Sequence, residues 1–329
     1  MRIAGFVDLQ VNGYLGCDFT APDLAAEDFG QAADKLLAAG SAAFLATVVT
    51  APMQVYERNL PIIAAAAQCG RFRGRVLGIH LEGPFLSREP GAIGAHRPEH
   101  TLAADIDVLS RLMDLAGGQL RMLTLSPELS GAERMIRWAA GHGICAACGH
   151  TMATADGLAR AADAGATVFT HLGNGLPRMV PRHENPIWAA LAEDRLAATL
   201  ITDGQHLPNA VIKSFIRAKG ADRIAVVSDA APPAGMPPGH YRTLGNDCVL
   251  ESDGRLHSPS KNCLVGSSST MLQCMNHLAS LNILTADELR AVGLDNPLRL
   301  LGLTPADLPP AARAVQYDPA TKRFTATAR

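Results

Sequence analysis

Residues 75–84 read Arg-Val-Leu-Gly-Ile-His-Leu-Glu-Gly-Pro, an apolar run that ends in polar residues and a turn. Such a run, apolar on both faces, is typical of a strand buried in a parallel sheet. Similar short runs recur along the chain, and longer segments of helical period separate them. This alternation predicts strands that each lead into a covering helix.

The same pattern extends in both directions from residues 75–84. Strands are predicted at Ile3–Leu9, Ala43–Val49, Arg75–Leu81, Leu120–Leu125, Gly143–Cys148, Thr167–His171, Ala197–Ile201 and Ile224–Ser228. Helices are predicted at Glu27–Ala39, Met53–Cys69, Asp105–Leu115, Ala132–Ala140, Ala153–Ala164, Pro186–Glu193, Pro208–Lys219 and Ser269–Ser280. This alternation favours an α/β fold, a parallel sheet closed into a (β/α)8 TIM barrel. An open doubly wound sheet is the alternative, but the sequence after the first strand lacks the Gly-rich dinucleotide fingerprint.

Residues 239–264 interrupt this rhythm. Short strands around the turn Ser252-Asp253-Gly254 predict a small β excursion after the eighth barrel strand. We therefore expect residues 1–303 to form the barrel with this excursion. Residues 304–329 are expected to form a C-terminal tail, with another strand or two around Asp318–Lys322.

The composition excludes some classes of partner. Lys and Arg number 29 and Asp and Glu 31, so no clustered basic charge is available for a nucleic acid, and an anionic substrate must be held by a few placed groups. Neither a signal peptide nor an apolar stretch long enough to span a membrane is visible. The seven scattered cysteines are typical of reduced thiols. We expect a cytoplasmic protein.

Polar residues follow several predicted strands at the carboxyl end, where the active sites of such barrels lie. Glu82, His150 and His171 are one carboxylate and two imidazoles, which is a donor set of catalytic zinc and iron sites. Each has a plainer alternative, because a histidine at a strand end is more often a hydrogen-bonded structural residue and a Glu before Gly-Pro can cap a turn. Their joint placement favours a metal site.

The order of the motifs resembles that of the N-acetylglucosamine-6-phosphate deacetylases, a family of the amidohydrolase superfamily. The resemblance runs from about Gly5 to about Leu303 and rests on residues 5–13, 80–85, 149–151, 170–175, 203–206, 227–230 and 266–267. It implies hydrolysis of the acetamide of N-acetylglucosamine 6-phosphate, which gives glucosamine 6-phosphate and acetate. It also implies a homodimer.

The resemblance assigns roles residue by residue. Glu82, His150 and His171 match the metal ligands, and Asp229 matches the catalytic carboxylate. The positions that match substrate contacts are His206, Asn174, Gly175, Arg182 and His96. Gln10 and Asn12 stand where many superfamily members have the His-x-His pair of a second metal site. This looks like the single-metal form of the deacetylase, so we expect one divalent ion per chain, zinc or else iron.

Three departures from the family's sequence pattern bear on the predicted substrate more than on the predicted reaction. The chain begins almost at the first barrel strand, so most of the family's N-terminal β segment is expected to be absent. The loop residues Leu172–Leu176 and the continuation Arg182–Pro186 also differ from the usual pattern. Two other functions stay open, namely another amidohydrolase, acting on a different N-acetyl hexosamine or a cyclic amide, and a non-catalytic sugar-phosphate binding barrel.

Overall fold

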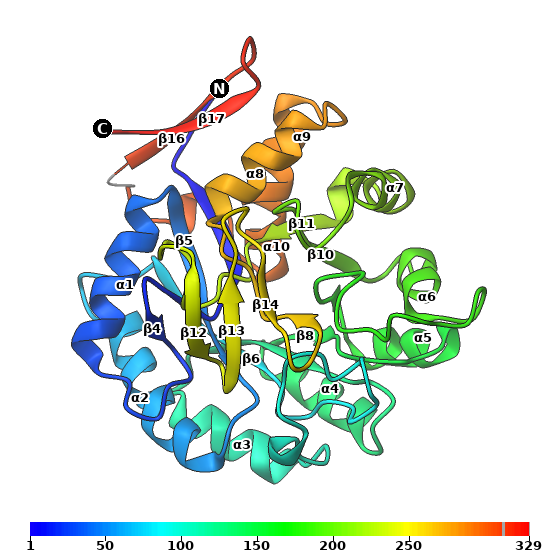
Figure 1. Ribbon diagram of the computed structural model, residues 1–329. Helices are drawn as coiled ribbons and strands as arrows, with labels where there is room; N and C mark the ends of the chain where they lie inside the picture. Colours follow the sequence, from blue (N-terminus) through cyan, green and yellow to red (C-terminus); the bar gives the residue numbers. More distant parts are fainter. Residues whose placement is uncertain (311–312, 329) are drawn as a thin grey trace.

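The computed structural model describes residues 1–310 and 313–328, and eight parallel strands at its centre form a (β/α)8 barrel (Figure 1). Their hydrogen-bonded order follows the sequence: β2 (Phe6–Val11), β5 (Ser41–Val49), β6 (Val76–Glu82), β7 (Leu120–Leu125), β8 (Cys145–Cys148), β9 (Val168–Phe169), β10 (Ala197–Ile201) and β11 (Ile224–Val227). A parallel bridge between Val11 and Ala230 joins the last strand to the first. The predicted barrel is confirmed. The alternative, an open doubly wound sheet, is wrong because the strands of such a sheet do not lie in sequence order.

Helices surround the barrel and bury their Ala- and Leu-rich faces against it. They are α1 (Ala26–Ala38), α2 (Met53–Gln68), α3 (Ile106–Leu115), α4 (Ala132–Gly141), α5 (Ala155–Ala164), α6 (Pro186–Ala192), α7 (Asn209–Lys219) and α8 (Met271–Ser280). Their starts follow from local chemistry: the side chains of Asp105, Thr154 and Asn185 each accept a hydrogen bond from a first-turn backbone N–H. No helix in the described ranges has the length and apolar content needed to cross a membrane.

Some elements were not predicted from the sequence. Two short helices, α9 (Ala286–Arg290) and α10 (Asn296–Leu300), follow α8 and are joined by a π-helical turn at Ala291–Asp295. Short 3-10 turns occur at Pro98–His100, Ala221–Arg223 and Pro305–Asp307. The predicted sixth strand is shorter than expected, because only Val168–Phe169 keeps strand geometry before His171 turns away.

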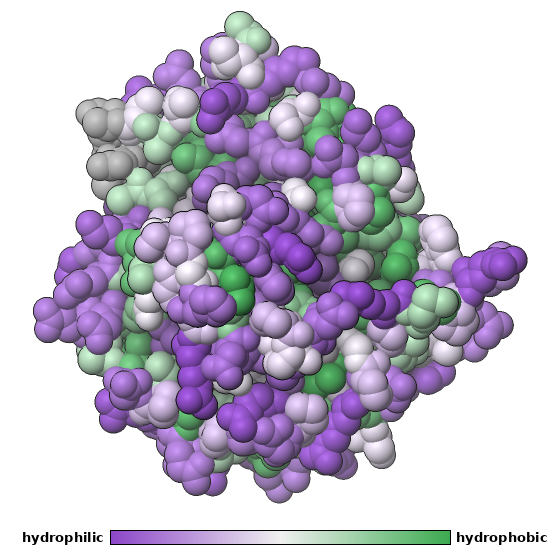
Figure 2. Space-filling view, in the orientation of Figure 1, coloured by the Kyte–Doolittle hydropathy of each residue, from purple (hydrophilic) through white to green (hydrophobic). Residues whose placement is uncertain are grey.

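An antiparallel sheet lies over one side of the barrel mouth, where the sequence predicted the β excursion. It contains β12 (Gly239–Thr243), β13 (Asn246–Leu250), β14 (Leu256–Ser258) and β15 (Cys263–Leu264). We call it the roof sheet. It has a small apolar core of its own, formed by Ala231, Cys248, Leu250, Leu256 and Val265. Figure 2, in the same orientation, shows that this face of the molecule is mostly hydrophilic.

The two ends of the described chain meet in a third sheet. β1 (Arg2–Ile3) pairs with β16 (Arg313–Asp318), which pairs with β17 (Arg323–Ala328). The sequence predicted a strand or two around Asp318–Lys322, and residues 319–322 form the turn between β16 and β17. A hairpin of β3 (Gly13–Tyr14) and β4 (Cys17–Asp18) follows the first barrel strand.

Candidate active site

Every residue predicted as a ligand or as the base lies at the carboxyl end of a barrel strand. Glu82 ends β6, while His150, His171 and Asp229 each follow their strand by two residues. The last three have φ angles of 50°, 31° and 50°, in the left-handed region that residues other than glycine rarely adopt. These turns direct the three side chains into the barrel mouth, and such strained backbone is common at functional sites.

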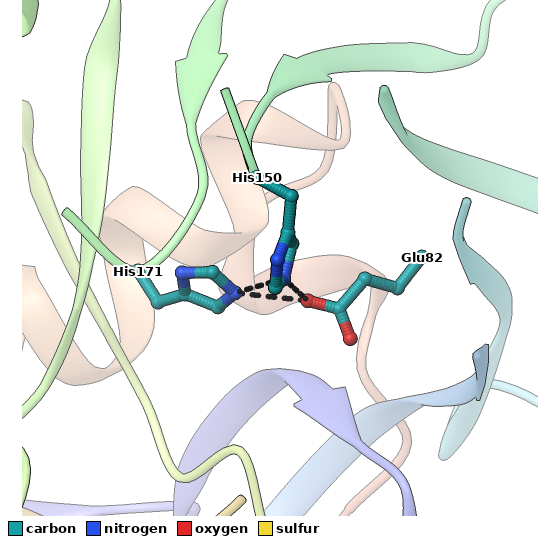
Figure 3. Close-up of side chains that lie close together, drawn as sticks. All are labelled: Glu82, His150 and His171. Atoms are coloured by element: carbon teal, nitrogen blue, oxygen red, sulfur yellow. Dashed lines mark hydrogen bonds and ion pairs between the residues drawn. The ribbon is translucent and has the colours of Figure 1, made fainter. Parts of the chain in front are cut away.

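Glu82, His150 and His171 converge on one point, as Figure 3 shows. Glu82 Oε1 lies 3.2 Å from His150 Nε2 and 2.9 Å from His171 Nε2, and the two nitrogens are 3.1 Å apart. These separations resemble the roughly 3.3 Å between neighbouring ligands of a tetrahedral ion with bonds of about 2.0–2.1 Å. All three residues are buried.

The hydrogen bonds around these side chains fit a metal ligand set. His150 Nδ1 donates to the Ala92 carbonyl at 2.8 Å, which leaves a lone pair on Nε2, the atom that faces Glu82. Burial alone would raise the pKa of Glu82, but its contacts with His150 and His171 hold it well below its usual range. The residues can therefore bind a divalent ion, with a carboxylate that stays ionised.

Two amide side chains lie beside the metal centre, where a second metal site would need ligands. Gln10 Nε2 donates to Glu82 Oε1 at 2.9 Å and to Asp229 Oδ1 at 3.1 Å, and Asn12 Nδ2 donates to the same Oδ1 at 2.7 Å. Their N–H groups point at the carboxylates, and a donor cannot ligate a cation.

Asp229 is buried beside the metal centre. Burial and the nearby Glu82 charge raise the pKa of Asp229 to about 7. A carboxyl group with such a pKa can both accept and return a proton near neutral pH.

His206 reaches the same cavity from the loop after β10. Its Nδ1 donates to Asp203 Oδ2 at 2.8 Å, and Asp203 Oδ1 accepts from the backbone N–H groups of Gln205 and His206. Burial alone would lower the pKa of His206, but this hydrogen bond and the charge of Asp203 raise it. No role was predicted for Asp203, although its position three residues before His206 in a turn was a usable signal.

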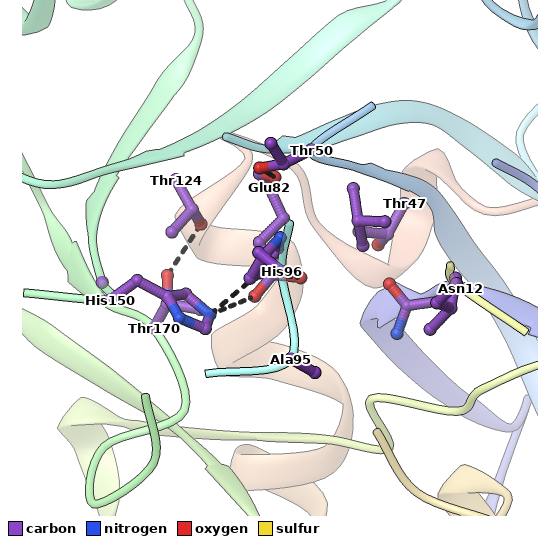
Figure 4. A network of polar contacts seen from close by, with 12 residues as sticks. Asn12, Thr47, Thr50, Glu82, Ala95, His96, Thr124, His150 and Thr170 are labelled. Carbon is purple, nitrogen blue, oxygen red and sulfur yellow. Dashed lines mark hydrogen bonds and ion pairs between the residues drawn. The ribbon is translucent and has the colours of Figure 1, made fainter. Parts of the chain in front are cut away.

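His96 lies against the metal ligands, and Figure 4 shows it beside Glu82 and His150. Its Nε2 is 3.2 Å from His150 Nε2 and 3.9 Å from Glu82 Oε2. Burial and the neighbouring His150 lower the pKa of His96 to about 3, so this imidazole is neutral at ordinary pH. A neutral ring at this position is suited to contact a polar substrate group next to the ion.

These residues share one cavity of about 570 Å³. Its lining includes Asn12, Glu82, His96, His150, His171, Asn174, Gly175, His206 and Asp229. Gln10 lies just behind the wall, bonded to Glu82 and Asp229. Arg182 is exposed and is not among the lining residues, so its predicted contact with a phosphate stays a prediction. Two other cations, Arg178 and Lys261, line the cavity instead.

The chain is similar to known proteins along most of its length. No protein-family model matches the sequence. The chain is 37% identical over 317 residues to an N-acetylglucosamine-6-phosphate deacetylase of Bos taurus, covering 91% of this chain and 74% of that protein. It is 30% identical over 300 residues to an N-acetylgalactosamine-6-phosphate deacetylase of Escherichia coli O157:H7, covering 91% and 77%.

A solved structure is similar along nearly the whole chain. It is a mutant N-acetyl-D-glucosamine-6-phosphate deacetylase from Mycobacterium smegmatis in complex with N-acetyl-D-glucosamine-6-phosphate. The TM-score is 0.88 at 30% identity, and the match covers 99% of this chain and 85% of that one.

Proposed function

Because this chain belongs to the N-acetylglucosamine-6-phosphate deacetylase family, we propose that it hydrolyses the acetamide of N-acetylglucosamine 6-phosphate to glucosamine 6-phosphate and acetate. The observation that carries the proposal is the convergence of Glu82, His150 and His171 beside Asp229 and His206 in one cavity. A non-catalytic barrel would not need a carboxylate of raised pKa next to a ligand set.

Glu82, His150 and His171 would hold one divalent ion, which we propose to be zinc. Such an ion supplies a polarised acetyl carbonyl and a water of lowered pKa. Asp229 accepts the proton of the attacking water and delivers it to the departing nitrogen. His206 donates a hydrogen bond to the acetyl oxygen as it gains negative charge, and Asp203 holds the ring in place for this.

The roof sheet and the loop at residues 174–178 enclose the sugar over the metal centre. Asn174, Gly175 and His96 are the neutral groups available to its hydroxyls. We further propose that the protein acts in the cytoplasm as a homodimer, as the family resemblance implies.

Acetate release tests this function. Purified protein with its metal content measured is assayed on the 6-phosphates of N-acetylglucosamine, N-acetylgalactosamine and N-acetylmannosamine, and on unphosphorylated N-acetylglucosamine. We expect the highest kcat/KM on N-acetylglucosamine 6-phosphate. Preference for another epimer would show that the protein catalyses the same reaction on a different substrate. Failure to release acetate from any of them, with one equivalent of metal bound, would contradict the proposal.

A further inference from the structure

The barrel has a seam, the boundary between its first strand β2 and its last strand β11. The other neighbouring barrel strands pair in parallel ladders, but within the described part of the chain the seam is joined by the isolated bridge between Val11 and Ala230. Gln10 and Asn12 lie on the β2 side of the seam, and Asp229 follows β11 on the other side. The residue proposed to move the proton therefore lies where the barrel has the least backbone pairing.

The carboxylate of Asp8, on β2, crosses this seam. Asp8 Oδ1 accepts hydrogen bonds from the backbone N–H of Ser228 at 3.1 Å and from that of Gln10 at 3.3 Å, and Oδ2 accepts one from the Ser228 hydroxyl. Asp8 is 1% exposed, and a buried carboxylate lowers stability unless donors compensate for the lost water. Its donors come from both sides of the seam, so the side chain supplies the hydrogen bonds that a strand ladder would otherwise supply.

Ser228 extends this connection to the backbone of Asp229. Its hydroxyl oxygen accepts a hydrogen bond from the Ala230 N–H at 3.1 Å, which spans Asp229. The φ angle of Asp229 is 50°, a left-handed conformation that persists only where the surrounding structure holds it. On the other side, the Ser267 N–H donates to the Asp229 carbonyl at 2.8 Å. We call Asp8 and Ser228 the seam clamp.

We propose that Asp8 and Ser228 are positioning residues for the hydrolysis, which hold Asp229 in the left-handed conformation that directs its carboxyl group to the metal centre. The inference rests on the proposed function, because it takes Asp229 to transfer the proton. A general base must lie within hydrogen-bond reach of that proton, and a displacement of about 1 Å can lower a rate on the order of 100-fold. Among the described residues that line the cavity, neither clamp residue occurs, so both act through Asp229.

A purely structural role is the alternative, and the chain offers a matched control for it. Asn296 on α10 is 3% exposed, and its Nδ2 donates to the carbonyls of Ile224 at 2.6 Å and Ala221 at 2.8 Å. Ile224 begins β11, whereas the seam clamp acts at its end. Asn296→Ala therefore loosens the same strand without reaching Asp229.

The test measures acetate release, metal content and Tm for Asp8→Asn, Ser228→Ala and Asn296→Ala, each made in the wild type and in Asp229→Asn. In the wild type, we expect either clamp variant to lower kcat roughly 10- to 100-fold, with KM for N-acetylglucosamine 6-phosphate and metal content nearly unchanged. In Asp229→Asn, the same substitutions should lower kcat by less than about twofold, because the residue through which they act is gone. Asn296→Ala should lower Tm and leave kcat nearly unchanged in both backgrounds.

Three kinetic results would overturn the inference. An equal loss of kcat in both backgrounds would show that the seam clamp has a general structural role. Unchanged kcat in both clamp variants would show that Asp229 does not depend on it. A higher KM with unchanged kcat would place the effect on substrate binding instead.

Crystal structures of the wild type and Ser228→Ala keep this inference separate from the proposed function, because they require no turnover. In the variant, we expect the φ angle of Asp229 to leave the left-handed region and Asp229 Oδ1 to move out of hydrogen-bond reach of Asn12 Nδ2. An unchanged Asp229 would overturn the inference even if the wild type releases acetate. If the wild type releases none, the proposed function fails, and these structures alone decide whether the clamp holds Asp229.

Discussion

Asn12 Nδ2 donates a 2.7 Å hydrogen bond to Asp229 Oδ1, which joins the end of the first barrel strand to the end of the last. Gln10 Nε2 bonds the same oxygen at 3.1 Å. Both amides thus orient the carboxyl group through Oδ1 and leave Oδ2 to exchange a proton. This geometry is suited to a proton shuttle.

Replacing Asp229 by Asn tests the shuttle, because Asn keeps the shape of the side chain but cannot accept the proton. We expect kcat to fall roughly 10²- to 10⁴-fold, the usual contribution of general acid–base catalysis, with metal content unchanged. Steady-state kinetics and elemental analysis of the same preparation check this. Loss of metal from the variant would make Asp229 a ligand, and near-normal turnover would remove it from the mechanism.

Single Ala variants of Glu82, His150 and His171 test the metal centre. Each should lose most of its bound metal, because each removes one of three protein ligands. The wild-type protein should contain about one equivalent. His142→Ala, on the exposed end of α4, is the matched control. Full occupancy in all three variants would refute the ligand set, and two equivalents in the wild type would refute our interpretation of Gln10 and Asn12.

Asp203→Asn tests how His206 is held. Removing the carboxylate beside Nδ1 should lower the pKa of His206, since a nearby opposite charge favours the protonated ring. NMR titration of the imidazole measures this, and kcat/KM should fall as well because the ring loses its anchor. An unchanged pKa would show that Asp203 does not control His206.

Asp8→Asn gives a prediction about pH and stability. Burial raises the pKa of Asp8 to about 6, against hydrogen bonds from Ser228 that lower it. A raised carboxyl pKa favours the folded state at low pH, and this contribution is lost as pH rises from about 4 to 6. Relative to the wild type, the free energy of unfolding of the neutral variant should therefore rise by up to roughly 3 kcal/mol across that window. Urea unfolding at pH 4.5 and 7.5 measures the difference, which would stay constant if Asp8 were not involved.

Phe324→Ala tests how firmly the terminal sheet packs on the barrel. The Phe324 ring is 2% exposed and meets Phe6 edge-on, with ring centroids 5.0 Å apart. Removing it should lower the free energy of unfolding by roughly 3–5 kcal/mol. Thr325 is exposed on the same strand, and Thr325→Ala should lower the free energy of unfolding far less. Equal effects would show that the sheet contributes little packing.

Much of the fold followed from the sequence because barrel strands are buried on both faces and leave apolar runs. Glu82, His150 and His171 were recognisable because their joint placement at strand ends favours a shared site over a separate structural role for each residue. The positive φ angles of His150 and His171 depend on tertiary contacts that no local pattern encodes. Lys261 was not predicted because only the folded roof sheet brings its loop to the cavity.

The pairing of β1 with β16 has a consequence for synthesis. Arg2 and Ile3 find their partners at Gln316 and Val315, about three hundred residues later. A nascent chain that emerges from its amino end can assemble early barrel strands while β1 still lacks a partner. Contacts so distant in sequence form slowly. The terminal sheet can therefore form only after β16 has been synthesised, and a chain truncated before residue 313 would leave β1 without its partner strand.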